Sequence, residues 1–372
     1  MDYNENFRRF RVSDSMYDSW TKNRQPYIAT VELLSACNLS CIHCYLGVHR
    51  QEPQQLTYAQ LLHILDELRE AGVLQIALTG GECMLRPDFP QIYEYAKKSG
   101  FLVTVFSNLT VLTQDILDKL IEYPPFSVEI SLYGASEDTY QKITGQRVFE
   151  KVMSNIAVLV ENKIRIGLKT PLIIQNSDDK QALEDIAKSF GTELRVGFAM
   201  SPTIDKELYP EKFALDLSTR FLHESSNTVG NTTGLKESDI NNPWGEIYDA
   251  GSFVPQFICN PGVSDVFVDY MGNVAPCVAY RSISKSLLEH SFQEIWDGFA
   301  YLKKMPCLPN NKCIRCESRY FCTICVAEQD TLRNDFCYTP QDVCIYAQAR
   351  KKYYKDQLCV SDVLDFIKKS GM

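Results

Sequence analysis

Three cysteines lie within eight residues near the start of the chain, in the segment Cys37-Asn-Leu-Ser-Cys41-Ile-His-Cys44. They directly follow an apolar run, Ile28 to Leu34, which predicts a β-strand. A strand that delivers three soft thiolate ligands into one loop can hold a four-iron cluster by one edge and leave its fourth iron open to a ligand that is not protein. The alternatives are three buried cysteines, half of a disulfide framework, or a zinc knuckle.

The zinc alternative needs a fourth ligand, because zinc usually takes four nitrogen or sulfur ligands. His43 is the nearest candidate, but it lies inside the short C-x2-C loop, where it is poorly placed to share the ion. The chain has fourteen cysteines, of which four precede residue 84 and ten lie between 259 and 359. In a reducing cytosol this usage favours metal or redox roles over structural disulfides.

The bulk composition excludes several classes of protein. The 372 residues are 45% apolar and 23% charged, which is an ordinary globular mixture, and the net charge is −9. We see no basic stripe, so we expect no nucleic-acid partner. The first ten residues are polar and no run approaches eighteen apolar residues, so we expect no signal peptide and no membrane span. These features predict a cytoplasmic protein.

The elements that must position the cysteines alternate between strand and helix. Apolar strands are predicted at 28–34, 74–79, 102–106, 127–132, 164–169 and 194–200, and helices at 57–72, 88–100, 113–123, 138–162 (broken near Gly145) and 178–190. Such alternation predicts a parallel sheet covered by helices. Periodicity does not distinguish an open doubly wound sheet from a partial barrel, but both place reactive groups at the carboxyl ends of the strands.

A second motif, Thr79-Gly80-Gly81-Glu82, stands between the second strand and the next helix. Glycines without a Cβ let the backbone approach a ligand closely, and Glu82 can meet a cation such as an ammonium group. The plain alternative is a tight turn.

Together these motifs resemble the radical S-adenosylmethionine (radical SAM) superfamily: the C-x3-C-x2-C spacing, Tyr45 directly after it, and a Gly-Gly-Glu sequence on the following strand. The resemblance implies a partial (β/α)6 barrel of the TIM type, a [4Fe-4S] cluster on the three cysteines, and S-adenosylmethionine as cofactor. The family commonly has proline where this chain has Cys83. The cofactor contacts that the resemblance implies are His43, Tyr45, Gly80, Gly81, Glu82, Ser107, Asn108, Ser131 and Lys142.

The last third of the chain carries another cysteine set. Cys259 and Cys277 frame a hairpin-like segment as C-x12-G-x4-C, and a C-x2-C-x5-C-x2-C run from Cys313 to Cys325 follows. A zinc ribbon would separate its paired knuckles by ~15–20 residues, but five residues separate these. The set resembles the SPASM extension, which binds two auxiliary iron–sulfur clusters, although its last spacing is one residue short.

The SPASM resemblance implies two ligand sets. The outer cluster would be held by Cys313, Cys316, Cys322 and Cys344, and the inner one by Cys259, Cys277 and Cys325. Cys307, Cys337, the substrate or an open iron would complete the inner set. The expected organisation is a lead at 1–26, the radical SAM barrel at 27–200, a connector at 201–258, the SPASM domain at 259–359 and a tail at 360–372.

The resemblance also implies a reaction class. Reductive cleavage of S-adenosylmethionine gives a 5′-deoxyadenosyl radical, which abstracts hydrogen from a peptide substrate to form a thioether or carbon–carbon crosslink, or to oxidise or epimerise it. We expect an electron donor such as flavodoxin or ferredoxin. Only 36 residues precede Cys37, so a leader peptide, if there is one, would need a separate recognition protein or another surface of this chain.

Three alternatives stay open at this point. Anaerobic sulfatase-maturing enzymes carry an aspartate, used as a base, directly after the second cysteine of the G-x4-C motif, where this chain has Val278. A valine cannot take a proton, which argues against that activity. The others are a small-molecule radical SAM dehydrogenase and a non-catalytic metal-binding scaffold.

Overall fold

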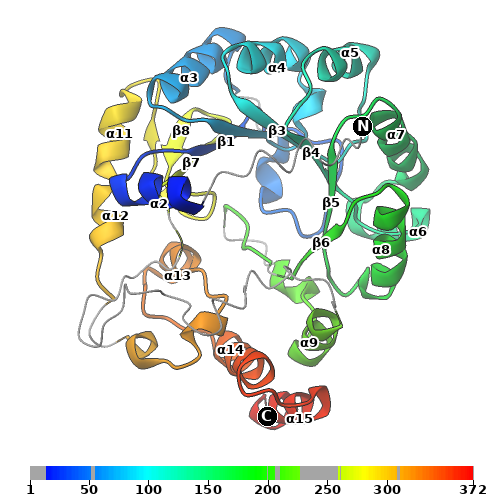
Figure 1. The fold of residues 1–372 in the computed structure, drawn as a ribbon, viewed down its shortest axis with the longest axis vertical. Helices are drawn as coiled ribbons and strands as arrows, with labels where there is room; N and C mark the ends of the chain where they lie inside the picture. The colour runs from blue at the N-terminus through cyan, green and yellow to red at the C-terminus, as the bar shows by residue number, and fades with distance from the viewer. Residues whose placement is uncertain are drawn as a thin grey trace.

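The fold is built on one nine-stranded sheet. The computed structural model describes residues 14–51, 55–198, 200–205, 210–226, 259, 261–307 and 311–371. The strand order is β6-β5-β4-β3-β2-β1-β7-β8-β9, and the first six strands pair in parallel. These six are β1 (Ile28–Glu32), β2 (Gln75–Thr79), β3 (Leu102–Ser107), β4 (Ser127–Ser131), β5 (Ile166–Pro171) and β6 (Leu194–Gly197). They curve into a partial barrel (Figure 1), which confirms the predicted fold class.

Amphipathic helices cover the outer side of this sheet (Figure 1). They are α3 (Tyr58–Glu70), α4 (Phe89–Lys98), α5 (Gln114–Glu122), α6 (Glu137–Thr144), α7 (Phe149–Glu161) and α8 (Lys180–Ser189). Thr57 and Gln60 form the predicted capping box of α3, each side chain accepting from the other residue's backbone N–H. Gly145 ends α6 with φ +77°, a left-handed conformation that glycine adopts without strain, so the predicted break in this helical stretch is present.

The C-terminal strands continue the same sheet. The predicted hairpin is present as β7 (Asp265–Val268) and β8 (Asn273–Ala275), with β9 (Lys285–Ser286) beyond it. Asp269 Oδ1 accepts from the backbone N–H groups of Met271 and Asn273 and so fixes the turn. The pairing of β7 with β1 in parallel was not predicted. This pairing brings the segment that carries Cys277 beside the strand that leads to Cys37.

The N-terminal segment is more than the expected polar lead, because residues from Asp14 form helix α2 (Asp14–Asn23). The helix lies beside α11 (Phe292–Gly298) and α12 (Ala300–Lys304), which replace the single helix predicted at 292–304 (Figure 1). Lys303 Nζ donates to the carbonyls of Thr21 and Lys22 at 2.6 and 2.9 Å. Trp296 Nε1 donates to Arg24 O at 3.0 Å. Residues 14–24 are therefore held directly against the helices of residues 292–304.

A second, smaller core lies away from the barrel. It joins α9 (Leu217–Ser225) of the connector to α14 (Gln341–Tyr354) and α15 (Val360–Ser370), with α13 (Val326–Arg333) between this core and the sheet (Figure 1). Its buried residues are Phe221, Tyr346, Ala349, Val363 and Ile367. The segment expected as a tail at 360–372 contains α15, which buries an apolar face in this core. The polar connector stretch from residue 227 on lies outside the described residues. In the described part, no helix is long and apolar enough to cross a membrane.

Candidate active site and metal centres

A cavity of about 470 Å³ lies at the carboxyl ends of the parallel strands. It collects side chains from five successive strand ends, together with Cys277 and Val278 from the segment after β8. Of the predicted site residues, the following line it: Cys37, Cys41, His43, Cys44, Tyr45, Gly80, Gly81, Ser107, Asn108, Ser131 and Cys277. The sheet therefore brings together most of the predicted cofactor site.

The three-cysteine loop is braced by its neighbours. Ser40 N and Ile42 N donate to the carbonyls of Thr144 and Ile143 at the end of α6, at 2.8 and 2.9 Å. The sulfur of Cys37 accepts from Leu39 N at 3.4 Å, and Asn108 Nδ2 lies 3.7 Å from it. Because N–H donors favour a charged sulfur over a neutral one, these contacts suit a thiolate at this position.

His43 supplies a polar atom that the protein leaves unsatisfied. Its Nδ1 is buried and has no hydrogen-bond partner among the described residues, while its ring lies 5.3 Å from that of Tyr133. Burial lowers the pKa of His43 to about 4, so the imidazole is neutral at pH 7. A cavity with three thiols, an orphaned ring nitrogen and adjacent N–H donors fits a cluster with a polar organic cofactor. Among the described residues, no three His, Cys, Asp or Glu side chains gather closely enough to hold a single metal ion.

The two glycines after β2 have a structural reason of their own. A Cβ on Gly80 would overlap the carbonyl of Leu34, and one on Gly81 would overlap the carbonyls of Ser35 and Ala36. Gly81 N donates to Leu34 O at 2.9 Å. The glycines thus let β2 pack against the backbone that leads into the cysteine loop, and they also line the cavity.

Glu82 faces into the protein and does not line the cavity. Its carboxylate accepts from Ser107 Oγ at 2.8 Å, Asn108 N at 2.7 Å and Met84 N at 3.1 Å. Burial raises the pKa of this carboxyl and the three hydrogen bonds act against that rise. The structure therefore gives Glu82 the role of fixing the strand end that carries Ser107 and Asn108. Its predicted contact with an ammonium group remains a prediction.

The structure places Lys142 away from the cavity and Lys169 on its wall. Lys142 is exposed on α6 and is not among the residues that line the cavity. Lys169, which the sequence analysis did not single out, lines it from β5, beside Ser131 of β4 in the strand register. Its Nζ lies 3.6 Å from the centre of the Phe106 ring, and burial lowers its pKa to about 8. A lysine at the carboxyl end of the strand predicted at 164–169 was the signal that could have revealed it.

The predicted inner auxiliary cysteines interact with one another, and one of them lines the large cavity. Cys277 lines the cavity, and the charges of Cys259, Cys277 and Cys325 act on one another. Burial raises the pKa of Cys259 to about 11 and that of Cys325 to about 12. A coordinating metal deprotonates such thiols outright, so this set suits ligands of a bound cluster better than reactive thiols.

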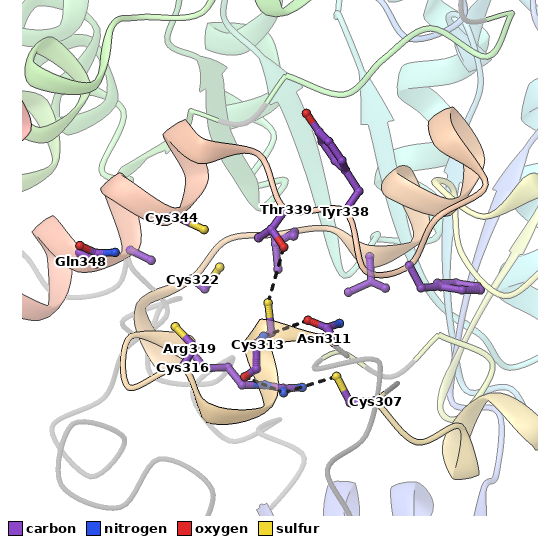
Figure 2. Close-up of a pocket in the computed structure, with 14 residues that line it drawn as sticks. Cys307, Asn311, Cys313, Cys316, Arg319, Cys322, Tyr338, Thr339, Cys344 and Gln348 are labelled. Atoms are coloured by element: carbon purple, nitrogen blue, oxygen red, sulfur yellow. Dashed lines mark hydrogen bonds between the residues drawn. The ribbon is translucent and has the colours of Figure 1, made fainter. Parts of the chain in front are cut away.

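The outer set surrounds a smaller cavity near the C-terminus (Figure 2). Cys313, Cys316, Cys322 and Cys344 all line it, as their predicted grouping requires. Cys307 lines the same cavity, on the far side of Arg319 in this view, and Arg319 Nη1 lies 4.0 Å from its sulfur. Cys337 interacts electrostatically with Cys307 and Cys313. Both candidates for the fourth inner ligand therefore lie with the outer set.

A third cavity of about 140 Å³ adjoins the first. Tyr45 and Val278 line both. The remaining walls come from residues 201–204 after β6 and from Arg281, Glu328 and Thr331. Ile204 N donates to Tyr45 O at 2.8 Å and holds the two segments together.

Comparison with known proteins gives one family and several relatives. Residues 31–189 match the family described as the Radical SAM superfamily. The AdoMet-dependent heme synthase of Methanosarcina barkeri (strain Fusaro / DSM 804) is 26% identical over 344 residues, which cover 88% of this chain and 98% of that protein. The sporulation killing factor maturation protein SkfB of Bacillus subtilis (strain 168) is 27% identical over 297 residues, covering 78% and 69%. The crystal structure of Streptococcus suis SuiB bound to precursor peptide SuiA has a TM-score of 0.69 at 16% identity and covers 88% of this chain and 78% of that chain; this likeness is one of fold.

Proposed function

Residues 31–189 form a radical SAM domain, and from this premise we propose that the chain is a three-cluster radical SAM enzyme of the SPASM type that modifies a peptide. When bound, a [4Fe-4S] cluster and S-adenosylmethionine supply the one-electron chemistry that removes hydrogen from an unactivated C–H bond. Cys37, Cys41 and Cys44 would hold the cluster. The predicted inner and outer cysteine sets would hold two auxiliary clusters.

The observation that carries the proposal is the shared cavity. The three-cysteine loop forms one wall, and Cys277 with Val278 forms another. A substrate between these walls would meet the cofactor on one side and the inner auxiliary site on the other. Either transfer of an electron to that site or ligation by it suits an overall oxidation such as a crosslink.

The protein's own residues would orient the cofactor and exclude water. Backbone groups at Gly80 and Gly81 border the cavity, and Glu82 holds Ser107 and Asn108 in place. Lys169, rather than Lys142, would face the carboxylate of the methionine moiety, because it is the lysine that lines the cavity. Ser131 pairs with Lys169 across the strand register. We include a flavodoxin or ferredoxin donor, a separate peptide-recognition protein and a cytoplasmic location in the proposal.

The peptide assignment draws on the continuity of the cavities. Tyr45 and Val278 line both the large cavity and its neighbour, so an extended substrate can run from one into the other. SkfB, a maturation protein, supports the same class. Val278 faces the cavity at the position where sulfatase-maturing enzymes carry a base, and a valine cannot act as one.

A second candidate is an enzyme that acts on a porphyrin. The specific observation in its favour is the match to the heme synthase, which extends over 98% of that protein, compared with 69% of SkfB. We rank it second, since the two adjoining cavities suit an extended chain better than a single flat macrocycle.

Three measurements test this proposal. Anaerobic reconstitution should give about twelve irons per chain, three clusters of four, whereas two zinc ions without a visible charge-transfer band would contradict it. Titration with iron coproporphyrin should leave the Soret band unchanged. A shift of that band that saturates at micromolar porphyrin would reverse the ranking of the two candidates. A sulfatase peptide that carries the target cysteine should stay unmodified, and its conversion to formylglycine would overturn the inference from Val278.

A further inference from the structure

Glu32, Tyr45 and Arg281 form a hydrogen-bonded cluster, the Glu32 network, beside both cavities. Tyr45 OH donates to Glu32 Oε1 at 2.6 Å. Arg281 donates two hydrogen bonds to the same carboxylate, from Nη2 to Oε1 at 2.8 Å and from Nη1 to Oε2 at 3.1 Å. Both carboxylate oxygens are therefore satisfied, and the parallel geometry is the strong, directional form of an arginine–carboxylate pair.

Each member of the network comes from a different part of the chain. Glu32 is the last residue of β1. Tyr45 directly follows the ligand candidate Cys44. Arg281 opens the short 3₁₀ helix Arg281–Ile283, and its Nε donates back to Val278 O at 3.1 Å, next to Cys277. The network thus links the loop of the first cysteine set to the loop of the inner auxiliary set by an unbroken series of hydrogen bonds.

The charged groups of the network are largely shielded from solvent. Glu32 is fully buried, and the Arg281 guanidinium lies 4.3 Å from the centre of the Phe267 ring on β7. Removing two charges from water is costly, and well-packed apolar residues of the same volume often give equal or greater stability. What an apolar cluster cannot supply is a fixed geometry between two loops, which a bidentate pair does supply.

We propose that the Glu32 network is a positioning device that fixes the Cys44 loop and the Cys277 loop on opposite sides of the substrate cavity. This inference rests on the proposed function, since it assigns the network to the relation between two cluster sites. Tyr45 then acts through its hydroxyl on Glu32. Tyr45 and Arg281 act as one unit, because both bind the same carboxylate and the Arg281 guanidinium lies 5.6 Å from the centre of the Tyr45 ring.

The chain offers a matched control in a second buried Arg–Glu–Tyr cluster. Glu224 accepts from Arg350 Nε at 2.8 Å and from Tyr346 OH at 2.6 Å. Arg350 Nη1 also donates to Phe321 O, the carbonyl before Cys322. This cluster has the same chemistry but joins α9 to α14, and none of its three residues lines the large cavity or its 140 Å³ neighbour.

The test compares reconstituted holoproteins carrying Tyr45→Phe, Arg281→Met, both changes, or Arg350→Met. Electron paramagnetic resonance of the dithionite-reduced protein is recorded with and without S-adenosylmethionine. Its signals report on the first cluster site and on the inner cluster site, independently of any activity assay. We expect Tyr45→Phe and Arg281→Met each to shift the signals of both sites. Each should also slow 5′-deoxyadenosine formation about tenfold, and the double variant should be no slower than the worse single variant. Arg350→Met should lower the melting temperature of the iron-free protein as much as Arg281→Met does, with the first-site signal unchanged.

Additive effects of Tyr45→Phe and Arg281→Met would overturn the inference, as would a signal change confined to one site or the same first-site change in Arg350→Met. If the wild-type signal still responds to S-adenosylmethionine in these cases, the proposed function stands. A wild-type signal that ignores S-adenosylmethionine would overturn the proposed function and this inference with it.

Discussion

At the scale of single residues, Lys169 lowers the stability of the fold at neutral pH. Its amino group lies on a cavity wall, on β5, where burial lowers its pKa to about 8. At pH 7 the charged form of this lysine is therefore less stable in the folded protein than in the unfolded chain, where water surrounds it. A residue of this kind in a cavity is a candidate for binding a ligand of opposite charge.

Lys169→Met is expected to stabilise the iron-free protein at pH 7 by on the order of 1–2 kcal/mol, a figure reduced to allow for partial solvent exposure and for the lost contact with Phe106. The unfolded lysine has a pKa of about 10.4, so between about pH 8 and that value the unfolded state binds more protons and wild-type stability rises. The difference between variant and wild type should thus shrink above pH 8. Urea unfolding of both proteins at pH 7 and pH 10 measures this difference in the free energy of unfolding. A less stable variant at pH 7, or a constant difference, would contradict the assignment.

Gly81→Ala is expected to destabilise the protein by about 1–3 kcal/mol, because its Cβ would overlap two backbone carbonyls of the segment before Cys37 and neither can move without displacing the loop. Gly298→Ala in α11 is the control, since a Cβ there meets nothing within 4 Å. This change should be neutral or slightly stabilising. The melting temperatures of both variants are measured by thermal unfolding. Equal melting temperatures would show that the close approach of Gly81 to the two carbonyls does not contribute to stability.

The residues that sequence analysis located are those whose type and spacing carry the chemistry. Cys37, Cys41 and Cys44 belong to one loop, and local spacing is enough to place them together. Lys142 and Lys169 could not be sorted in this way. Both lie near the ends of predicted elements, but the sequence does not state which face of α6 or which end of β5 turns to the cavity. Glu82 also needed the structure, because its partners follow a different strand.

At the scale of elements, the pairing of β7 with β1 determines where the inner auxiliary cysteines lie. The hairpin of β7 and β8 is local, so turn residues and alternation predicted it. Its neighbour on the other side is more than two hundred residues away in sequence. No local pattern names that partner, since a parallel pairing depends on which sheet edge is available after the barrel has formed.

Val268→Pro should test this pairing. Val268 is fully buried and pairs with Val31 on one side and Val274 on the other, so its N–H has a neighbour in either direction. Proline removes that donor and should cost about 3 kcal/mol or more. Val268→Ala is the matched variant, because it keeps the N–H and loses only side-chain packing. Chemical unfolding should show a clearly larger loss for proline, and equal losses would indicate that the ladder here contributes little.

At the scale of the whole molecule, the barrel and the C-terminal cysteine region share one core. The main apolar cluster runs from Ala29 on β1 to Ala327 on α13, and the N-terminal helix α2 with Arg24 contacts α11 and α12. One apolar core therefore contains residues from both sides of the limits expected at 200 and 259. The grouping of the outer cysteines was what the SPASM resemblance implied. The same resemblance left Cys307 as a candidate for the inner set, whereas Cys307 lines the cavity of the outer set.

The most direct test of the central claim is reductive cleavage of S-adenosylmethionine by the reconstituted wild-type protein and by Cys41→Ala. With dithionite and the cofactor under anaerobic conditions, we expect the wild type to release 5′-deoxyadenosine over many turnovers, since the three-cysteine loop leaves the fourth iron open to the cofactor. Cys41→Ala should release none above the protein-free background, while its melting temperature without iron stays within a few degrees of wild type. Equal 5′-deoxyadenosine from the two proteins would remove the Cys37–Cys44 loop from the chemistry and contradict the assignment of this chain as a radical SAM enzyme.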